Sequence, residues 1–308
     1  MKLKKIIVFG SNGLVGNSLR RKLENYKHIF NIFFSTRNDT NLFSFNETSE
    51  LINKINPDII INAAAKVGGI VANNTERADF LIDNIKINLN ILESCIPNPK
   101  IKILNLGSSC IYPLNATNPI SEDSFMDGKL EPTNSPYAMA KLTAIELSNS
   151  LHIQHGHQII NLMPTNLYGP NDNFSETKSH VIPGLIARMH KAKIEKKDKF
   201  YIWGTGKPLR EFLHVDDLAD AILFLIEKNT SNTLVNVGSG EEISIKNLAE
   251  LIKETIGFKG KLFFDENMPD GNPRKLLDSS LISSYGWKPK ISLEKGLQST
   301  YEWFKNNN

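Results

Sequence analysis

Residues 4–16 read KKIIVFGSNGLVG, an apolar run that leads directly into a glycine-rich turn and then into a helical pattern. The run at 6–9 is typical of a buried strand, and Val15, Leu19 and Leu23 recur every four positions, as they do on one face of a helix. Strand, glycine turn and helix in this order open a βαβ unit. The stretch therefore predicts the first strand of a doubly wound α/β fold.

The alternation of strand and helix continues along the chain. Further strand patterns occur at 28–36, 58–65, 100–109 and 158–165, and helical patterns occur at 80–95 and 136–154. Because helical crossovers join parallel strands, we expect an α/β protein with a Rossmann-type doubly wound parallel sheet. After residue 170, strand patterns at 199–204 and 234–240 and helical patterns at 182–192, 215–227, 245–256 and 293–304 predict a smaller C-terminal α/β lobe.

Two domains are expected within the 308 residues. We assign 1–170 to a nucleotide-binding Rossmann domain and 171–308 to a substrate-binding lobe, with some segments at about 205–240 returning to the first domain. With 40% apolar and 22% charged residues, the chain has the composition of an ordinary globular protein.

Charge and cysteine content exclude several classes of function. The net charge of +3 is too small to indicate a nucleic acid or membrane partner. No apolar run approaches the length of a membrane span. Cys95 and Cys110 provide neither a disulfide framework nor a metal-ligand cluster. We therefore expect a cytoplasmic protein without a metal.

The glycine turn is a predicted cofactor site. Glycines allow a backbone to approach a pyrophosphate, which then lies at the positive end of the following helix. The residues of this turn are Gly10, Ser11, Asn12, Gly13, Leu14, Val15 and Gly16. The second strand ends in FSTRND, where Arg37 suits the 2′-phosphate of NADPH better than the ribose hydroxyls of NAD. NAD remains an alternative, because Asp39 lies two residues further on and Arg37 could be a solvated loop charge.

A second motif, TNSPYAMAK at 133–141, indicates a proton donor. Pro136 suits the first turn of a helix, so Tyr137 and Lys141 fall four residues apart on one face. A neighbouring ammonium favours the phenolate and is expected to lower the tyrosine pKa from its ordinary value of about 10. Ser108, at the end of the strand at 100–109, is expected to hydrogen-bond the same substrate oxygen. A tyrosine in the core and a lysine on the surface would be the structural alternative.

With these motifs in this order, the chain resembles the extended short-chain dehydrogenase/reductase family, and within it the branch that acts on GDP-4-keto-6-deoxy-D-mannose. The blocks that carry the resemblance are AAAKVGGIVANN (63–74), LGSSCIYP (106–113), PTNSPYAMAK (132–141), MPTNLYGPNDNF (163–174), SHVIPGLIARMHKAK (179–193), WGTGKPLREFLHVDDLADA (203–221) and PDGNPRKLLD (269–278). The resemblance implies epimerisation at C3 and C5, followed by NADPH-dependent reduction at C4, which gives GDP-L-fucose.

The resemblance also implies roles for individual residues. Cys110 and His180 match the pair that exchanges protons at the carbons beside the ketone, although a small buried cysteine and a loop histidine are the structural alternatives. Further cofactor contacts are expected at Asn41, Leu42, Ala63, Ala64, Leu106, Gly107, Lys141, Pro164, Asn166, Leu167 and His180. Substrate contacts are expected at Arg188, Trp203, Arg210, Asp270 and Arg274. Core packing of Trp203 and exposed salt bridges of the arginines are the alternatives.

Other interpretations remain open at this point. His214, Asp216 and Asp217 resemble metal ligands, but we expect HVDD to fix a loop and cap the following helix. A homodimer is expected by analogy with the family. The chain could also be a C4 reductase of another GDP-4-keto sugar, such as a heptose, or a 4-epimerase or dehydratase with tightly bound NAD. A non-catalytic nicotinamide-binding regulator is the alternative from another class, and Ser108, Tyr137 and Lys141 together disfavour it.

Overall fold

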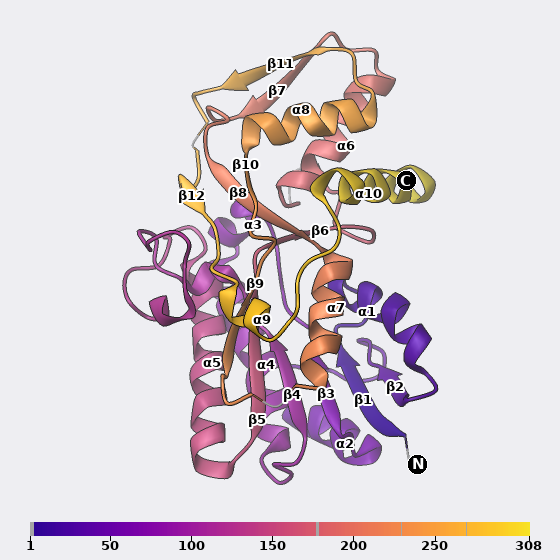
Figure 1. Ribbon diagram of the computed structural model, residues 1–308, viewed down its shortest axis with the longest axis vertical. Helices are drawn as coiled ribbons and strands as arrows, with labels where there is room; N and C mark the ends of the chain where they lie inside the picture. The colour runs from indigo at the N-terminus through magenta and orange to yellow at the C-terminus, as the bar shows by residue number, and fades with distance from the viewer. Residues whose placement is uncertain (1–2, 177–178, 229, 269) are drawn as a thin grey trace.

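The computed structural model describes residues 3–176, 179–228, 230–268 and 270–308. Its centre is a six-stranded sheet in the order β2-β1-β3-β4-β5-β9, in which every neighbouring pair is parallel (Figure 1). The strands are β1 (Lys4–Phe9), β2 (Phe30–Phe34), β3 (Ile59–Asn62), β4 (Lys102–Leu106), β5 (Gln158–Pro164) and β9 (Leu234–Val237). The predicted Rossmann-type sheet is therefore confirmed.

The strand order changes direction between β1 and β3. From β1 the chain crosses to β2 on one side, whereas β3, β4 and β5 follow on the other side. The connections that leave the carboxyl ends of β1 and β3 therefore diverge. Open α/β sheets bind their ligands at such a switch point.

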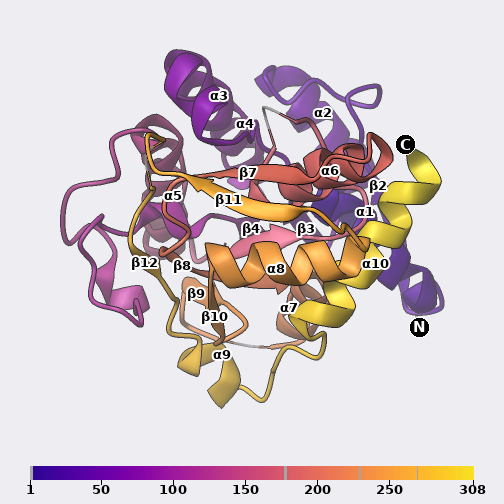
Figure 2. The same ribbon diagram turned by 90° about the horizontal axis from the view of Figure 1, so that it is seen from above.

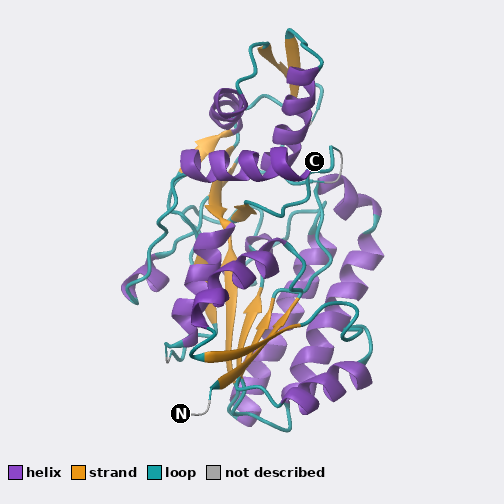
Figure 3. Cartoon of the chain, turned by 90° about the vertical axis from the view of Figure 1, so that its right-hand side faces the viewer, coloured by secondary structure: helices purple, strands orange, loops and turns teal. Residues whose placement is uncertain are grey.

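Helices cover both faces of the sheet (Figure 3). One face carries α1 (Leu14–Leu23) and α7 (Val215–Ile226), and the other carries α2 (Phe45–Ile55), α4 (Arg77–Cys95) and α5 (Ser135–His155). Alternate residues of β1 serve the two cores: Ile6 and Val8 pack toward α1 and α7, whereas Ile7 and Phe9 pack toward α2 and α4. Strands buried on both faces explain the continuous apolar runs in the sequence.

Three buried asparagines form a ladder across the middle of the sheet. Asn62 on β3, Asn105 on β4 and Asn161 on β5 are paired in register. The Asn62 amide donates to Asn105 Oδ1 at 2.8 Å, and the Asn105 amide donates to Asn161 Oδ1 at 3.0 Å. The Asn161 amide donates in turn to the Thr233 carbonyl at 3.1 Å. These bonds satisfy polar groups that would otherwise be costly to bury.

The smaller lobe lies above the carboxyl ends of the sheet, at the top of Figure 1. Its strands are β6 (Asn166–Tyr168), β8 (Leu209–His214), β10 (Glu242–Ser244), β12 (Arg274–Lys275), β7 (Lys199–Trp203) and β11 (Lys261–Asp265). The first four form a mixed sheet around β8, and β7 pairs with β11 (Figure 2). Several of these strands have two or three residues, too few for a periodic pattern, and the sequence analysis did not predict them.

Helices of the smaller lobe follow the sequence pattern closely. They are α6 (Val181–Ile194), α8 (Ile245–Ile256) and α10 (Leu293–Asn307). Ser244 and Ser292 cap α8 and α10 by accepting a hydrogen bond from the third residue of each helix. The remaining short helical segments are α3 (Ile70–Thr75), α9 (Ser280–Ser284), η1 (Glu24–Tyr26), η2 (Ser109–Ile111) and η3 (Glu122–Ser124). Within the described residues, no helix is both long and apolar enough to cross a membrane.

Candidate active site

The glycine turn lies between β1 and α1, at the switch point. Gly10 has a φ of +74°, and a Cβ there would lie 2.6 Å from the backbone of Ala63 and Ala64 at the end of β3. A Cβ at Gly16 would lie 2.3 Å from the Gly10 carbonyl oxygen, so this position also requires glycine. Among the described residues, no side chain caps α1 at Gly13, which leaves the positive end of the helix open to an anion. The turn therefore fits a pyrophosphate.

Side chains next to this turn have different surroundings. The Ser11 hydroxyl is buried and donates to the Ser35 carbonyl at 2.8 Å, so it joins the turn to the end of β2. Asp39 accepts hydrogen bonds from the Thr36 backbone N–H and hydroxyl, at 2.8 and 2.7 Å, and these bonds lower the pKa of its carboxyl group. The Arg37 side chain is exposed, and within the described parts of the chain it has no hydrogen bond or ion pair. Arg37 is thus free to contact a phosphate, whereas Asp39 is held by its own turn.

Most other predicted cofactor residues lie at the carboxyl ends of β3, β4 and β5. They are Ala63, Ala64, Leu106, Gly107, Pro164, Asn166 and Leu167. Asn41 and Leu42 lie instead in the turn before α2, and Asn12 is exposed in the glycine turn. The structure thus brings most of this set to the edge that contains the glycine turn.

Tyr137 and Lys141 lie side by side in the first two turns of α5. The Lys141 side chain is 2% exposed, and its ammonium donates to the Leu106 carbonyl at the end of β4 at 2.6 Å. The same ammonium lies 5.8 Å from the centre of the Tyr137 ring. Ser108 follows β4 and accepts a hydrogen bond from the Cys110 N–H at 3.3 Å. The strand end and the helix therefore bring the predicted catalytic residues together.

The predicted effect of Lys141 on the acidity of Tyr137 is corrected by the structure. Burial raises the pKa of the Tyr137 phenol above its ordinary value, and the nearby Cys110 raises it further. Burial also lowers the pKa of Lys141 to about 8. Desolvation is the largest cause of both shifts, because it disfavours the charged form of each group. In this structure Tyr137 is thus held as a neutral phenol, which can donate a proton.

Cys110 and His180 lie on different lobes. Cys110 is buried in η2, directly after the Ser108 strand end, and His180 immediately precedes α6. Burial raises the pKa of the Cys110 thiol, while Lys275, a hydrogen bond with Ser108 and Lys141 oppose this rise. The His180 side chain is exposed. The protein around it still removes part of its hydration, and this desolvation lowers its pKa. The Cys110 thiol thus interacts electrostatically with two lysines, Lys275 and Lys141.

The predicted substrate residues of the smaller lobe fall into two groups. Arg188 on α6 lies with its guanidinium carbon 5.8 Å from the ring centre of Trp203 at the end of β7, and Trp203 is 52% exposed. Arg210 on β8 is half-buried, and its guanidinium donates to the Leu209 carbonyl. Trp203 is thus not a core residue, and it offers an open aromatic face beside a cation.

Asp270 and Arg274 are already engaged within the protein. Asp270 accepts from the Thr205 N–H and hydroxyl at 2.9 and 2.6 Å. Arg274 is exposed, and its Nε donates to both carboxylate oxygens of Glu242 at 3.1 and 2.8 Å. These contacts give Asp270 a role in shaping the turn before β8 and give Arg274 the surface salt bridge that was its alternative.

Lys275 is a residue of the site that the sequence analysis did not identify. It lies next to Arg274 on β12, in the same PDGNPRKLLD block, and its ammonium interacts electrostatically with Cys110 and Arg210. The feature of the sequence that could have indicated Lys275 is its place directly after Arg274, as a second cation in the same block. Its proximity to Cys110, however, depends on strand pairing over more than 150 residues.

The HVDD segment is confirmed as a cap and a loop anchor. His214 precedes α7, and its Nδ1 accepts from the Asp216 N–H at 3.2 Å. Asp217 accepts from the backbone N–H groups of Lys290 and Ile291. Over the described ranges, no group of three or more His, Cys, Asp or Glu side chains could hold a metal ion.

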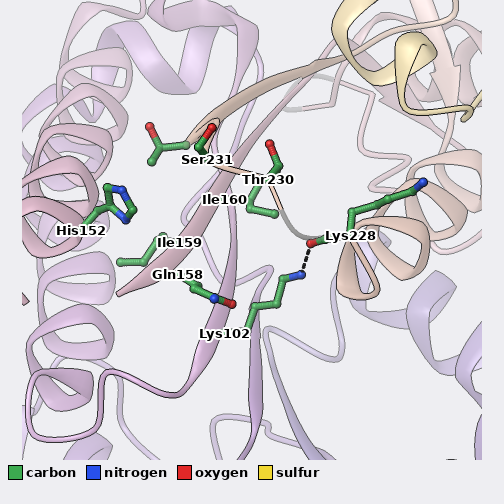
Figure 4. A pocket seen from close by; sticks show the side chains of 9 residues that line it. Lys102, His152, Gln158, Ile159, Ile160, Lys228, Thr230 and Ser231 are labelled. Atoms are coloured by element: carbon green, nitrogen blue, oxygen red, sulfur yellow. Dashed lines mark hydrogen bonds between the residues drawn. The ribbon is translucent and has the colours of Figure 1, made fainter. Parts of the chain in front are cut away.

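A cavity of about 330 Å³ lies at the opposite, amino end of the sheet (Figure 4). Lys102, His152 and Gln158 line it together with the segment that precedes β9. The Lys102 ammonium donates to the carbonyls of Leu225, Ile226 and Lys228 at 2.8, 2.8 and 2.6 Å, which uses all three of its donors. We assign no ligand to this cavity.

A Rossmann sheet with Ser108, Tyr137 and Lys141 at one edge defines a nucleotide-sugar epimerase or reductase of the short-chain dehydrogenase/reductase type. A model of the NAD dependent epimerase/dehydratase family matches residues 6–238, and the chain belongs to this family.

Three similar proteins cover nearly the whole chain. The putative GDP-L-fucose synthase 2 of Arabidopsis thaliana is 50% identical over 99% of this chain and 93% of its own. The GDP-L-fucose synthase of Escherichia coli K12 is 44% identical over 100% of this chain and 98% of its own. Among solved structures, MlghC, a GDP-mannoheptose C4 reductase from Campylobacter jejuni with NADP bound, is 33% identical, with a TM-score of 0.89 over 99% of both chains.

Proposed function

We propose that the protein converts GDP-4-keto-6-deoxy-D-mannose into GDP-L-fucose, by epimerisation at C3 and C5 and reduction at C4. The observation that carries this proposal is the buried Cys110, whose N–H donates to the Ser108 hydroxyl at 3.3 Å and which therefore lies beside the proposed proton-donor site. A simple C4 reductase needs a proton donor and a hydride source but no thiol. The 44–50% identity to proteins named GDP-L-fucose synthase supports the same activity.

In the proposed reduction, Tyr137 donates a proton to the C4 oxygen. Burial keeps the phenol protonated at neutral pH, and Ser108 donates a second hydrogen bond to the same oxygen. Lys141, fixed by the Leu106 carbonyl, holds a positive charge beside the phenol and stabilises the phenolate that forms. NADPH, when bound at the glycine turn, supplies the hydride that C4 receives.

In the proposed epimerisation, Cys110 and His180 exchange protons with C3 and C5. These C–H bonds are acidic because the resulting carbanion delocalises into the C4 carbonyl. The oxygen that gains this charge lies in the same Ser108 and Tyr137 cradle, so one pair of hydrogen bonds serves both reactions. Desolvation by the surrounding protein lowers the pKa of the exposed His180 side chain, which favours the neutral imidazole that can accept a proton.

The proposed cofactor is NADPH rather than NADH. Arg37 is exposed and unpaired beside the glycine turn, while Asp39, the nearby acid, is held by Thr36. Replacement Arg37→Ala should therefore lower kcat/KM for NADPH by about tenfold or more and leave that for NADH within about twofold. Equal effects on both cofactors would assign Arg37 no part in the choice.

The proposed substrate site lies on the smaller lobe. Arg188 and Arg210 bind the GDP diphosphate, Trp203 stacks on the base, and Asp270 shapes the turn between Trp203 and Arg210. In this proposal residues 1–170, together with α7 and β9, hold the cofactor, and the rest of 171–308 holds the GDP-sugar. We also propose a cytoplasmic homodimer, because Ile82 and Leu89 on α4 and Met139 and Ile153 on α5 are exposed apolar side chains.

The test is an incubation with GDP-4-keto-6-deoxy-D-mannose and NADPH in deuterated water, followed by NMR of the product. We expect GDP-L-fucose with deuterium at C3 and C5. Variant Cys110→Ser should lose most of the label and the product but still bind NADPH. Oxidation of NADPH with an unlabelled product would contradict the epimerase.

A second candidate is a C4 reductase of another GDP-4-keto sugar. It is favoured by the match to MlghC, whose chain is covered to 99%. Turnover of a GDP-4-keto-heptose at a higher kcat/KM than the 6-deoxyhexose, without deuterium exchange, would establish it.

A further inference from the structure

The backbone of Lys275 is fixed from two sides. Strand β12 pairs with β8, and Lys275 lies opposite Arg210 in this pairing. On the other side, the Leu276 N–H donates to Asn118 Oδ1 at 2.7 Å, and the Ile120 N–H donates to the Leu276 carbonyl at 2.8 Å. The segment that carries Asn118 and Ile120 begins a few residues after Cys110. Lys275 is therefore held between the proposed diphosphate site and the thiol.

A buried carboxylate strengthens this arrangement. Glu211 on β8 is fully buried, and its two carboxylate oxygens accept from the Gly240 N–H at 2.7 Å and the Leu277 N–H at 3.1 Å. Leu277 is two residues beyond Lys275, so Glu211 ties the end of β12 to β8. The backbone at Lys275 is thus fixed by strand pairing and by hydrogen bonds on both sides, and electrostatic interactions with Cys110 and Arg210 show that its ammonium lies near both.

The charges around Lys275 single out Cys110. Arg210 repels its ammonium, whereas Cys110 and Glu131 attract it. In the described part of the chain, the Lys275 ammonium has no hydrogen bond and no ion pair. A half-buried ammonium without such a bond is available to a neighbouring group that becomes negative.

The surroundings of Cys110 lead to the same conclusion. Burial disfavours its thiolate, and Lys275 is the strongest of the groups that favour it, ahead of Ser108 and Lys141. Lys141 is already bonded to Leu106 and lies beside Tyr137. The site therefore contains two lysines with different partners, one beside the phenol and one beside the thiol.

We propose that Lys275 is a positioning residue for epimerisation, whose ammonium stabilises the Cys110 thiolate. This inference rests on the proposed function. As a base, Cys110 begins the step as a thiolate and takes a proton from carbon; as an acid, it gives its proton to carbon and ends as a thiolate. The thiolate is the reactant form of Cys110 in the first role and its product form in the second, so Lys275 lowers the free energy of the thiolate in both.

The first experiment measures the thiol without turnover. The full-length protein is alkylated with iodoacetamide between pH 6 and 10, and mass spectrometry follows Cys110; Cys95 is fully buried with a pKa raised to about 12 and serves as an internal unreactive thiol. In Lys275→Met we expect the midpoint of Cys110 alkylation to rise by about one pH unit and the rate at pH 7.5 to fall about tenfold. Lys275→Arg should stay near the wild type, as should Lys259→Met on the same lobe. Identical profiles for Lys275→Met and the wild type would overturn the proposal.

The second experiment separates the two reactions. Lys275→Met should slow deuterium exchange at C3 and C5 about tenfold, and reduction of the already epimerised 4-ketone should stay within about threefold. Equal loss in both reactions, or a rise in KM alone, would assign Lys275 to GDP binding and overturn the proposal. If the wild type exchanges no deuterium, the proposed function fails, and the alkylation profile still decides whether Lys275 acts on Cys110. Thermal unfolding checks each variant, and Lys275→Gln replaces Lys275→Met if the latter is unfolded.

Discussion

A lysine lies at each end of β4, half-buried Lys102 on the strand itself and buried Lys141 on the neighbouring helix α5, and the two lysines have different partners. Burial lowers the pKa of Lys102, at the amino end, to about 8, and it lowers the pKa of Lys141, beside the carboxyl end, to about the same value. Lys102 makes three hydrogen bonds to carbonyls at the end of α7. Among the described residues, Lys141 makes one, to Leu106.

This difference separates a lysine that stabilises the fold from the lysine that is proposed to act in the reaction. The last carbonyls of a helix lack partners within the helix and carry partial negative charge, so a cation that bonds three of them stabilises the fold. Lys141 has donors to spare and lies beside Tyr137, where charge develops during a reaction. A similar pKa therefore does not imply a similar role, and the number of hydrogen bonds distinguishes the two.

The largest expected effect is at the carboxyl end. Variant Tyr137→Phe should reduce the turnover of NADPH oxidation by about 10²–10⁴-fold, because it removes the proposed proton donor to the C4 oxygen. The dissociation constant of the GDP-sugar, measured by titration calorimetry, should change less than about threefold. Activity within tenfold of the wild type would remove Tyr137 from the mechanism.

At the amino end, the expected effect is on stability. Lys102→Met leaves three helix-end carbonyls without their donor and should lower the free energy of unfolding by about 2–3 kcal/mol. Urea unfolding measures this change, and kcat at 25 °C should stay near that of the wild type. Lys100→Met, which removes an exposed lysine two residues earlier, should change stability by less than about 0.5 kcal/mol. A large loss of kcat in Lys102→Met would contradict the distinction.

A smaller effect should appear in the pH dependence of stability. Lys141 has a folded pKa of about 8, below the unfolded value of about 10.4, so between these pH values the unfolded chain binds more protons. Stability contributed by this group therefore rises with pH through that window. Between pH 7.5 and 9.5 the free energy of unfolding of the wild type should increase by about 1–2 kcal/mol relative to Lys141→Met. If the free energies of unfolding of the two proteins change in parallel with pH, burial does not lower the pKa of Lys141.

The smallest effect is expected at Arg274. Its guanidinium is exposed and bonded to Glu242, so Arg274→Ala should change KM for the GDP-sugar by less than about twofold. Arg210→Ala on the neighbouring strand, with a half-buried guanidinium, serves as the contrast and should raise KM at least tenfold. An equal rise in KM in Arg274→Ala and Arg210→Ala would show that Arg274 also binds the substrate.

Local patterns in the sequence predicted much of this molecule. The glycine turn, the strands of the parallel sheet and the helix that carries Tyr137 and Lys141 depend on residues close together in the chain. The HVDD cap was predicted for the same reason, since a side chain that accepts from a backbone N–H two residues away is a local feature.

Properties that depend on distant segments were not predictable. Cys110 and Lys275 approach each other because Leu276 and Leu277, next to the two-residue strand β12, contact Asn118 and Ile120, more than 150 residues earlier in the chain. The direction of the Tyr137 pKa was predicted wrongly because four-residue spacing shows a neighbouring charge but not the extent of burial. Lys102 was not identified, since its partners lie more than 120 residues away.

The asparagine ladder across β3, β4 and β5 bears on how such a chain can change over time. Replacing Asn161 by an apolar residue leaves the Asn105 amide without its acceptor in the core, at a cost of about 1–3 kcal/mol. Replacing all three removes the bonds within the ladder together and should cost less than the sum of the single changes, although the Ala64 N–H and Asn88 Oδ1 also lose a partner. The three positions are therefore expected to change together in evolution, because a chain that loses the ladder one residue at a time passes through less stable forms.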